Sequence, residues 1–190
     1  MMKIEIDKAT LEEALKQLSS LKETTNHLEY ALNKMSGVPS ELKTLNTLAV
    51  DIALKQKGIR ELTGKNDGEA IRKFQENIRG LQGEPWCASF VSYCFKEAAK
   101  ELGQERPFRH IPGVYTLTEM AQSNGWFIHA GSAIPKKGDI FVMSGDHTGL
   151  VISYNSENKT IKTIEGNLND SVDGRELPKQ GKITGYIRVS

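Results

Sequence analysis

Cysteine is the residue type in this sequence best suited to covalent chemistry, and both cysteines lie in the stretch PWCASFVSYCF, from Pro85 to Phe95. Cys87 and Cys94 are seven positions apart. In a helix this spacing separates them by two turns, or roughly 10 Å along the axis. A disulfide needs its two Cα atoms within about 7 Å of each other, so a helical segment excludes a bond between them.

An apolar stripe at helical spacing indicates that this segment is a helix. The stripe consists of Val91, Cys94, Phe95, Ala98 and Leu102. Cys94 lies inside it, where a free cysteine ordinarily behaves as a small hydrophobe. We therefore interpret Cys94 as part of the core.

Cys87 differs from Cys94 because it follows Pro85 and Trp86, at the point where the predicted helix begins. The unpaired amides and the positive end of the helix dipole favour a thiolate there, and the same amides can receive an oxyanion. Position alone leaves Cys87 open as a nucleophile or as an inert thiol. Trp86 beside it fits either the lining of a cleft or the core.

A nucleophilic cysteine needs a base, and four histidines are present. His27 lies in a predicted N-terminal helix, outside the row of apolar residues from Leu11 to Met35, and is interpreted as a solvated side chain. His110 and His129 have no periodic context that indicates a role. His147 opens the predicted strand over residues 148–154, in which small neighbours leave room for a substrate backbone. It is therefore the candidate base.

Strand pairing places two further polar residues near this base. A hairpin of residues 147–154 and 160–167 sets Tyr154 against Thr160, and counting back sets His147 against Asn167. Glu165 is then the diagonal neighbour of His147 on the same face, at about 7 to 8 Å between backbones. We therefore expect Glu165 and Asn167 to flank the imidazole.

The N-terminal part of the chain predicts helices. From Leu11 to Met35, apolar or small residues alternate in steps of three and four, as in a coiled coil. The segment from Ser36 to Ser40 ends this helix, and a second helix is predicted from Glu41 to about Lys57. The stripe is narrow, so the first helix should pack on the second helix, a copy of itself or a partner. A plain helical hairpin and an export or docking module both remain open.

The rest of the chain indicates a mixed domain. A helix is predicted over residues 69–79, and after Pro107 the pattern changes to short β-rich segments. Helices followed by an antiparallel sheet indicate an α+β fold, preceded here by the N-terminal helical hairpin. Two domains are predicted, a coiled-coil-like helical arm over residues 1–45 and a catalytic domain over residues 46–190. Strands are predicted over residues 139–143, 148–154, 160–165 and 183–189.

Composition excludes several classes of function. The 190 residues carry a net charge of +1, which gives no general attraction to nucleic acid or anionic lipid. No run of about 18 apolar residues is present, and the start MMKIEIDKAT lacks the pattern of a secretory signal. We expect no membrane insertion. The loop from Gly64 to Gly68 lacks the later acidic positions of a calcium loop, so neither a metal nor a cofactor is predicted.

Four ordered motifs resemble the CHAP domain, a family of cysteine- and histidine-dependent amidohydrolases and peptidases related to papain and to NlpC-type cell-wall peptidases. The resemblance covers about residues 48–189 and implies a papain-like α+β fold and cleavage of amide bonds in peptidoglycan. It implies Cys87 as the nucleophile, His147 as the base, Glu165 as the residue orienting the base, and Asn167 as an additional polar member. The motifs are Trp86-Cys87-Ala88-Ser89-Phe90-Val91-Ser92-Tyr93, Lys137-Gly138-Asp139-Ile140-Phe141, His147-Thr148-Gly149-Leu150-Val151 and Thr163-Ile164-Glu165-Gly166-Asn167.

The first 45 residues lie outside this resemblance. The seam helix followed by Met35-Ser36-Gly37 resembles the small helical-hairpin proteins of type VII secretion, with Met35 in place of their tryptophan. We expect export without a classical signal, through specialised secretion, phage carriage or lysis, and action at the bacterial cell wall. The N-terminal helices are candidates for binding a secretion-apparatus partner, a chaperone or an immunity protein.

Two other functions remain open. One is a deamidase or acyltransferase that uses the same thiol on a protein target. The other is a structural component of a phage tail or secretion apparatus with a vestigial thiol site. If the chain is a wall hydrolase, its sequence does not distinguish the muramoyl to alanine amide from a stem-peptide or cross-bridge bond, because all three need the same catalyst.

Overall fold

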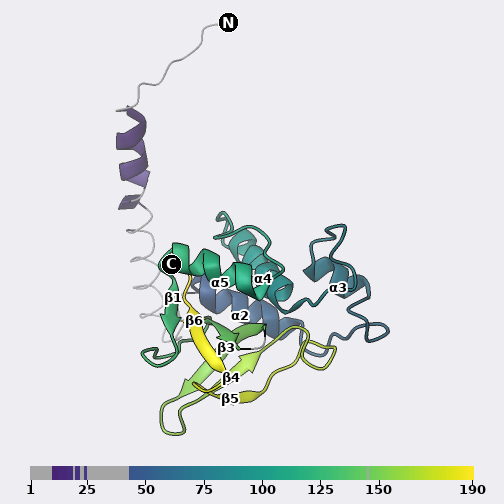
Figure 1. The fold of residues 1–190 in the computed structure, drawn as a ribbon. Coiled ribbons are helices and arrows are strands. Elements are labelled where there is room, and N and C mark those ends of the chain that lie inside the picture. The colour runs from purple at the N-terminus through teal and green to yellow at the C-terminus, as the bar shows by residue number, and fades with distance from the viewer. Residues whose placement is uncertain (1–9, 19, 22–23, 25–42, 145) are drawn as a thin grey trace, which may run out of the picture. The chain divides into compact units, whose positions relative to one another are not determined.

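The computed structural model describes residues 10–18, 20–21, 24, 43–144 and 146–190 (Figure 1). The chain divides into two compact units, residues 1–43 and 44–190. In the first unit residues 10–18 are helical, in agreement with the predicted first helix. The remainder of that helix, its predicted stop and His27 lie largely or wholly outside the described residues. The second unit contains every candidate catalytic residue.

Four helices belong to the second unit, and the first of them begins later than predicted. Lys43 and Thr44 are not helical, because the Thr44 side chain accepts a hydrogen bond from the Thr47 amide and so caps the helix that follows. This helix is part of the core of the second unit, since its residues 48–50, 52 and 53 are buried. The helices are α2 (Leu45–Lys55), α3 (Glu69–Phe74), α4 (Cys87–Glu101) and α5 (Val114–Ser123).

A six-stranded antiparallel sheet completes the second unit and confirms the α+β prediction. Its strand order is β1-β6-β2-β3-β4-β5. Helix α4 packs on both α2 and β3, and α2 also contacts β3 and β4, so the helix that begins at Cys87 lies beside another helix and against the sheet. The strands are β1 (Phe127–His129), β2 (Ile140–Met143), β3 (His147–Asn155), β4 (Thr160–Ile164), β5 (Glu176–Pro178) and β6 (Ile183–Ile187).

Three elements were missed by the sequence analysis. Helix α5 lies where only β-rich segments were expected, although its buried residues Val114, Leu117 and Ala121 follow helical spacing. Strands β1 and β5 have three residues each, too few to show an alternating pattern. Helix α3 ends at Phe74, five residues earlier than predicted, and Glu76 and Asn77 then take left-handed backbone angles.

The β3–β4 hairpin has the predicted register at one end only. Val151 pairs with Thr163, as predicted, in the half of the hairpin nearest the candidate base. A β-bulge follows Val151 and shifts the pairing by one residue, so Tyr154 lies opposite Ile161 instead of Thr160. The predicted pairing was therefore wrong only beyond the bulge.

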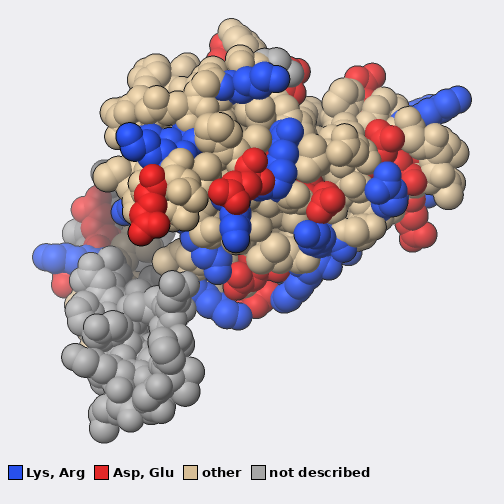
Figure 2. All heavy atoms as spheres, turned by 90° about the horizontal axis from the view of Figure 1, so that it is seen from below, with Lys and Arg blue, Asp and Glu red and all other residues tan. Residues whose placement is uncertain are grey.

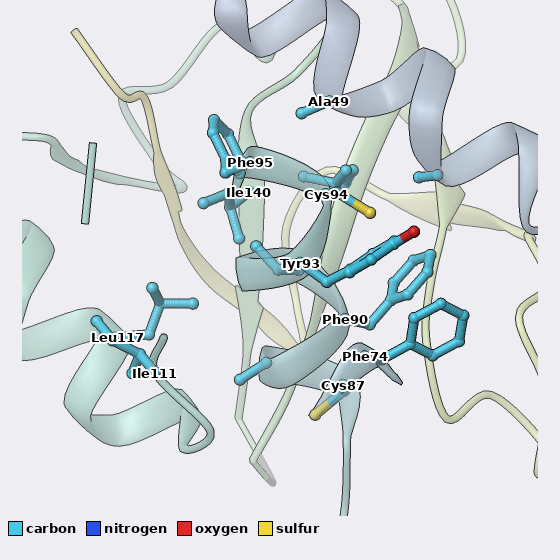
Figure 3. Close-up of a cluster of buried hydrophobic side chains, with 14 of the residues drawn as sticks. Ala49, Phe74, Cys87, Phe90, Tyr93, Cys94, Phe95, Ile111, Leu117 and Ile140 are labelled. Atoms are coloured by element: carbon cyan, nitrogen blue, oxygen red, sulfur yellow. The ribbon is translucent and has the colours of Figure 1, made fainter. Parts of the chain in front are cut away.

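Helix α4 is buried along most of its length (Figure 3). Phe74, Trp86 and Phe90 form an aromatic cluster beside its first turn, with ring centroids 5.0–6.2 Å apart. Cys94 is fully buried, and this burial raises the pKa of its thiol well above the ordinary value. Both cysteines are free. Among the described residues, no helix is long and apolar enough to cross a membrane.

Candidate active site

Cys87 is the first residue of α4, as predicted. The first amides of a helix have no partner within the helix, so they can donate hydrogen bonds to an anion at this point. The Cys87 side chain is largely buried, with 5% of the residue exposed. Figure 3 shows its sulfur pointing away from Phe74 and Phe90. The sulfur therefore lies at the edge of the core and close to unpaired donors.

His147 lies beside Cys87 at the end of the sheet. It is the first residue of β3 and pairs with Met143 of β2. Its side chain is 21% exposed, hydrogen-bonds with Glu165, and lies close enough to the Cys87 side chain for that thiol to raise its pKa. The distance from His147 Nε2 to Glu165 Oε2 is 2.7 Å. Thiol, imidazole and carboxylate thus form one connected row.

The imidazole of His147 holds a proton more strongly than usual. Burial lowers its pKa, but the hydrogen bonds and charges of Cys87 and Glu165 outweigh burial and raise the pKa to about 9. At neutral pH His147 is therefore positively charged. This arrangement suits a thiolate and imidazolium pair, in which the imidazolium already carries the proton that a leaving group needs.

Glu165 occupies space that a glycine provides. A Cβ atom at Gly149 would lie 2.7 Å from Glu165 Cγ and 2.9 Å from Phe141 Cε1. The small residue at position 149 was expected to leave room for a substrate backbone. That interpretation was wrong, because the Glu165 side chain and the Phe141 ring fill this room.

The carboxylate of Glu165 is fully buried and has several donors. Besides His147, it accepts hydrogen bonds from Thr163 Oγ1 and from the guanidinium of Arg175. Burial raises the pKa of Glu165, but the hydrogen bonds from His147, Arg175 and Thr163 outweigh burial and lower it. Glu165 is therefore an ionised group behind the imidazole.

Asn167 reaches a different part of the site from the one expected. Its backbone is left-handed, with φ at 59°, so the chain turns away from the line of β4 after Ile164. Its amide lies 3.0 Å from the Asn66 side chain. In the orientation that satisfies its neighbours, it accepts from the Trp86 backbone amide at 3.2 Å and donates to Glu61 at 3.3 Å. Asn167 thus contacts the residue before the nucleophile, not the imidazole.

Trp86 belongs to the core. The residue is fully buried, and its indole Nε1 donates to Glu61 Oε1 at 2.8 Å. The other oxygen of Glu61 accepts from the Asn66 backbone amide at 2.7 Å. The loop around Glu61 therefore holds the start of α4 through the indole. Sequence reasoning missed this role, because an exposed-looking acidic residue in a loop carries no periodic signal.

Of the other described histidines, His110 has the more structured surroundings. Its side chain is 4% exposed, and its Nε2 lies 3.2 Å from Ser89 Oγ. Burial lowers the pKa of His110, while the nearby Glu76 opposes the effect. Ser89 is fully buried, so this pair cannot meet a substrate. His129 is exposed at the end of β1.

Residues 80–167 match the family model of the CHAP domain. The chain carries a CHAP domain. The matched region of this CHAP domain includes all four candidate residues, and the resemblance inferred from the motifs is confirmed. Comparisons with curated proteins and with solved structures gave no match.

A CHAP domain indicates a cysteine- and histidine-dependent amidohydrolase or peptidase with a papain-like fold. In this CHAP domain, α4 supplies the cysteine and the antiparallel sheet supplies the histidine. Arg175 lies beyond the matched region. Sequence reasoning also missed Arg175, because β5, the strand that follows it, was not predicted. Within the described part of the chain, no group of three or more His, Cys, Asp or Glu residues is arranged to hold a metal ion.

Proposed function

We propose that the chain is a thiol-dependent peptidoglycan hydrolase that cleaves an amide bond through an acyl-enzyme on Cys87. The observation that carries this proposal is the connected row of Cys87, His147 and Glu165 inside a CHAP domain. Each member of the row has the environment its role needs. The sulfur lies at a helix start, the imidazole is charged and the carboxylate is ionised.

The reaction follows from these positions. The Cys87 thiolate attacks the carbonyl carbon, and the oxygen of the tetrahedral intermediate receives hydrogen bonds from amides at the start of α4. The His147 imidazolium gives its proton to the amide nitrogen as the carbon–nitrogen bond breaks, which releases the amine and leaves a thioester. Neutral His147 then takes a proton from water as this water attacks the thioester, and the sulfur leaves as thiolate.

Peptidoglycan is the substrate class that the CHAP domain supports best. Its candidate bonds are the N-acetylmuramoyl-L-alanine amide and the amide bonds of stem peptides and cross-bridges. The chain has a net charge of only +1, and the face in Figure 2 carries basic and acidic side chains interspersed. Recognition of the wall polymer is therefore assigned to the site and not to general electrostatic attraction.

Digestion of purified peptidoglycan tests this proposal. The wild-type chain should release soluble fragments, and Cys87→Ala should release none while keeping its folded circular-dichroism spectrum. Cys94→Ala is the matched control, because it removes the other thiol from the buried stripe and should keep activity if the fold survives. Mass spectrometry of the fragments identifies the new ends and so the bond. Fragments released by Cys87→Ala would refute the proposal.

Thiol labelling separates an active centre from a vestigial one. A working site should alkylate Cys87 far faster than the fully buried Cys94 when both compete for iodoacetamide. Equal and slow labelling of the two cysteines in the folded protein would favour the structural-module alternative. A deamidase or acyltransferase would label Cys87 but release nothing from purified walls.

We propose separately that residues 1–45 form a targeting or docking arm for export. The partner would be a secretion-apparatus component, a chaperone or an immunity protein. Support comes from the helical residues 10–18, where Leu11, Leu15 and Leu18 are 53–65% exposed. Leu11→Glu with Leu18→Glu should lower the amount of extracellular protein and leave digestion of purified walls unchanged, whereas Lys16→Glu should alter neither. Normal export of the double variant would contradict this proposal.

A further inference from the structure

Arg175 grips the carboxylate of Glu165 with two parallel hydrogen bonds. Its Nε lies 3.0 Å from Oε1, and its Nη2 lies 2.9 Å from Oε2. A guanidinium that donates to both oxygens fixes the plane of a carboxylate, which one donor cannot do. Glu165 is fully buried, so its orientation is set by these protein donors and not by water.

Arg175 lies outside the β3–β4 hairpin, and backbone contacts with β4 place it beside the Glu165 carboxylate. The Thr163 amide donates to the Arg175 carbonyl at 3.0 Å, and the Thr163 hydroxyl contacts both that carbonyl and Glu165. Arg175 immediately precedes β5, the strand at the edge of the sheet. The backbone hydrogen bond between Thr163 and Arg175 therefore places the arginine side chain beside the Glu165 carboxylate.

Oxygen Oε2 of Glu165 is shared. It accepts from His147 Nε2 at 2.7 Å and from Arg175 Nη2 at 2.9 Å. We propose that Arg175 is a positioning residue of this site, which holds Glu165 in the plane that orients His147 and takes part of the negative charge that would otherwise act on the imidazole alone. The catalytic part of this inference rests on the proposed function.

The negative charge of Glu165 and the positive charge of Arg175 therefore act together on the His147 imidazole. Helix α4 presents Cys87 to it, and the segment after β4 presents Glu165 and Arg175. Asp173 lies in the same segment but pairs with Lys57 at 3.3 Å, and Asp146 precedes the histidine as an exposed residue. On the β2 side the paired residue is Met143, which is uncharged and whose sulfur lies 3.6 Å from Arg175 Nη2. Arg175 is thus the cation that limits how strongly Glu165 holds the histidine proton.

Titration of the His147 imidazole by NMR tests this balance without any substrate. The background is Cys87→Ala, so that the thiol does not titrate together with the ring, and His147→Gln assigns the resonance. Arg175→Gln should raise the His147 midpoint by about one pH unit, because the carboxylate then acts on one cation instead of two. Arg175→Lys keeps the positive charge but loses the paired hydrogen bonds of the guanidinium. In this variant the His147 midpoint should stay closer to that of the Cys87→Ala background.

Arg188 offers a matched control. Its guanidinium also donates to both oxygens of a buried carboxylate, that of Asp139, at 2.8 and 2.7 Å. None of its described hydrogen bonds reaches Glu165 or His147. Arg188→Gln should lower the melting temperature and leave the His147 midpoint unchanged. A variant of Arg175 that only disturbed packing would behave in the same way.

Activity of the same variants, with Cys87 restored, gives a second measurement. Arg175→Gln should lower kcat at least tenfold and move the alkaline limb of the pH profile upward, and Arg175→Lys should lower kcat while leaving that limb near its wild-type position. An unchanged His147 midpoint in Arg175→Gln overturns the inference. Absence of any wall hydrolysis would instead count against the proposed function, since the NMR titration does not depend on it.

Discussion

Cys87 is the first residue of α4, whereas Cys94 lies two turns further along the same helix and is fully buried in the core. The difference in position between these two thiols was predictable from the sequence, because the apolar stripe includes one of them and the helix start includes the other. The role of Asn167 was not predictable in the same way. Its left-handed backbone redirects the side chain, and strand counting assumes that the strand continues.

The pH profile is predicted at the scale of single residues. In the proposed reaction His147 must carry a proton to release the amine, and its pKa of about 9 sets where it loses this proton. Activity should therefore fall as pH rises through about 9. Glu165→Gln removes a negative charge that raises this pKa, so the alkaline limb should move to lower pH. The measurement is wall hydrolysis between pH 6 and 10, and an unmoved limb in Glu165→Gln would show that Glu165 does not act on the imidazole.

At the scale of elements, β3 and β4 form the support for the imidazole and its carboxylate. The alternation of residues in these strands predicted which face carries Glu165, and pairing near Val151 confirmed the register. The bulge, β5 and Arg175 were beyond prediction. Counting residues along paired strands assumes a regular ladder and so does not find a bulge, and the pairing of β5 with β4 joins residues that no short-range pattern connects.

Gly149→Ala tests the support that β3 gives to Glu165. The added methyl group would lie 2.7 Å from Glu165 Cγ and 2.9 Å from the Ile164 carbonyl oxygen, so the carboxylate must move. A displacement of about 1 Å should lower kcat about 100-fold, and overpacking should cost about 1–3 kcal/mol of unfolding free energy. Steady-state kinetics and urea denaturation measure the two effects.

Gly131→Ala is the control for this change, because a Cβ atom at Gly131 meets nothing within 4 Å. This variant should keep both activity and stability. If Gly149→Ala keeps full activity, the space beside Glu165 is not what holds the carboxylate in place.

At the scale of the whole molecule, the site depends on segments far apart in the sequence. Glu61 accepts from the Trp86 indole, 25 positions further on, and Asn167 contacts the same loop from the end of the β4 segment. Sequence reasoning found the α+β architecture, since buried stripes and strand patterns are local. These cross-links could not be predicted, because polar contacts between loops leave no periodic pattern in either loop.

Glu61→Ala tests this long-range support. It leaves the Trp86 indole N–H buried without its acceptor, which should cost about 1–3 kcal/mol of unfolding free energy. The variant should also have a lower kcat, since the indole no longer fixes the start of α4. Glu84→Ala removes an exposed carboxylate from the nearby chain and should change neither value. Thermal denaturation and initial rates provide the comparison, and equal stability of the two variants would contradict this role of Glu61.

The one-residue bulge after Val151 separates the two ends of the β3–β4 hairpin. Because the pairing register already changes at that point, a residue can be added to or removed from the turn at residues 155–159 without shifting the pairing near His147. The tip of this hairpin is therefore the natural place to insert a fluorescent or affinity tag without moving the histidine.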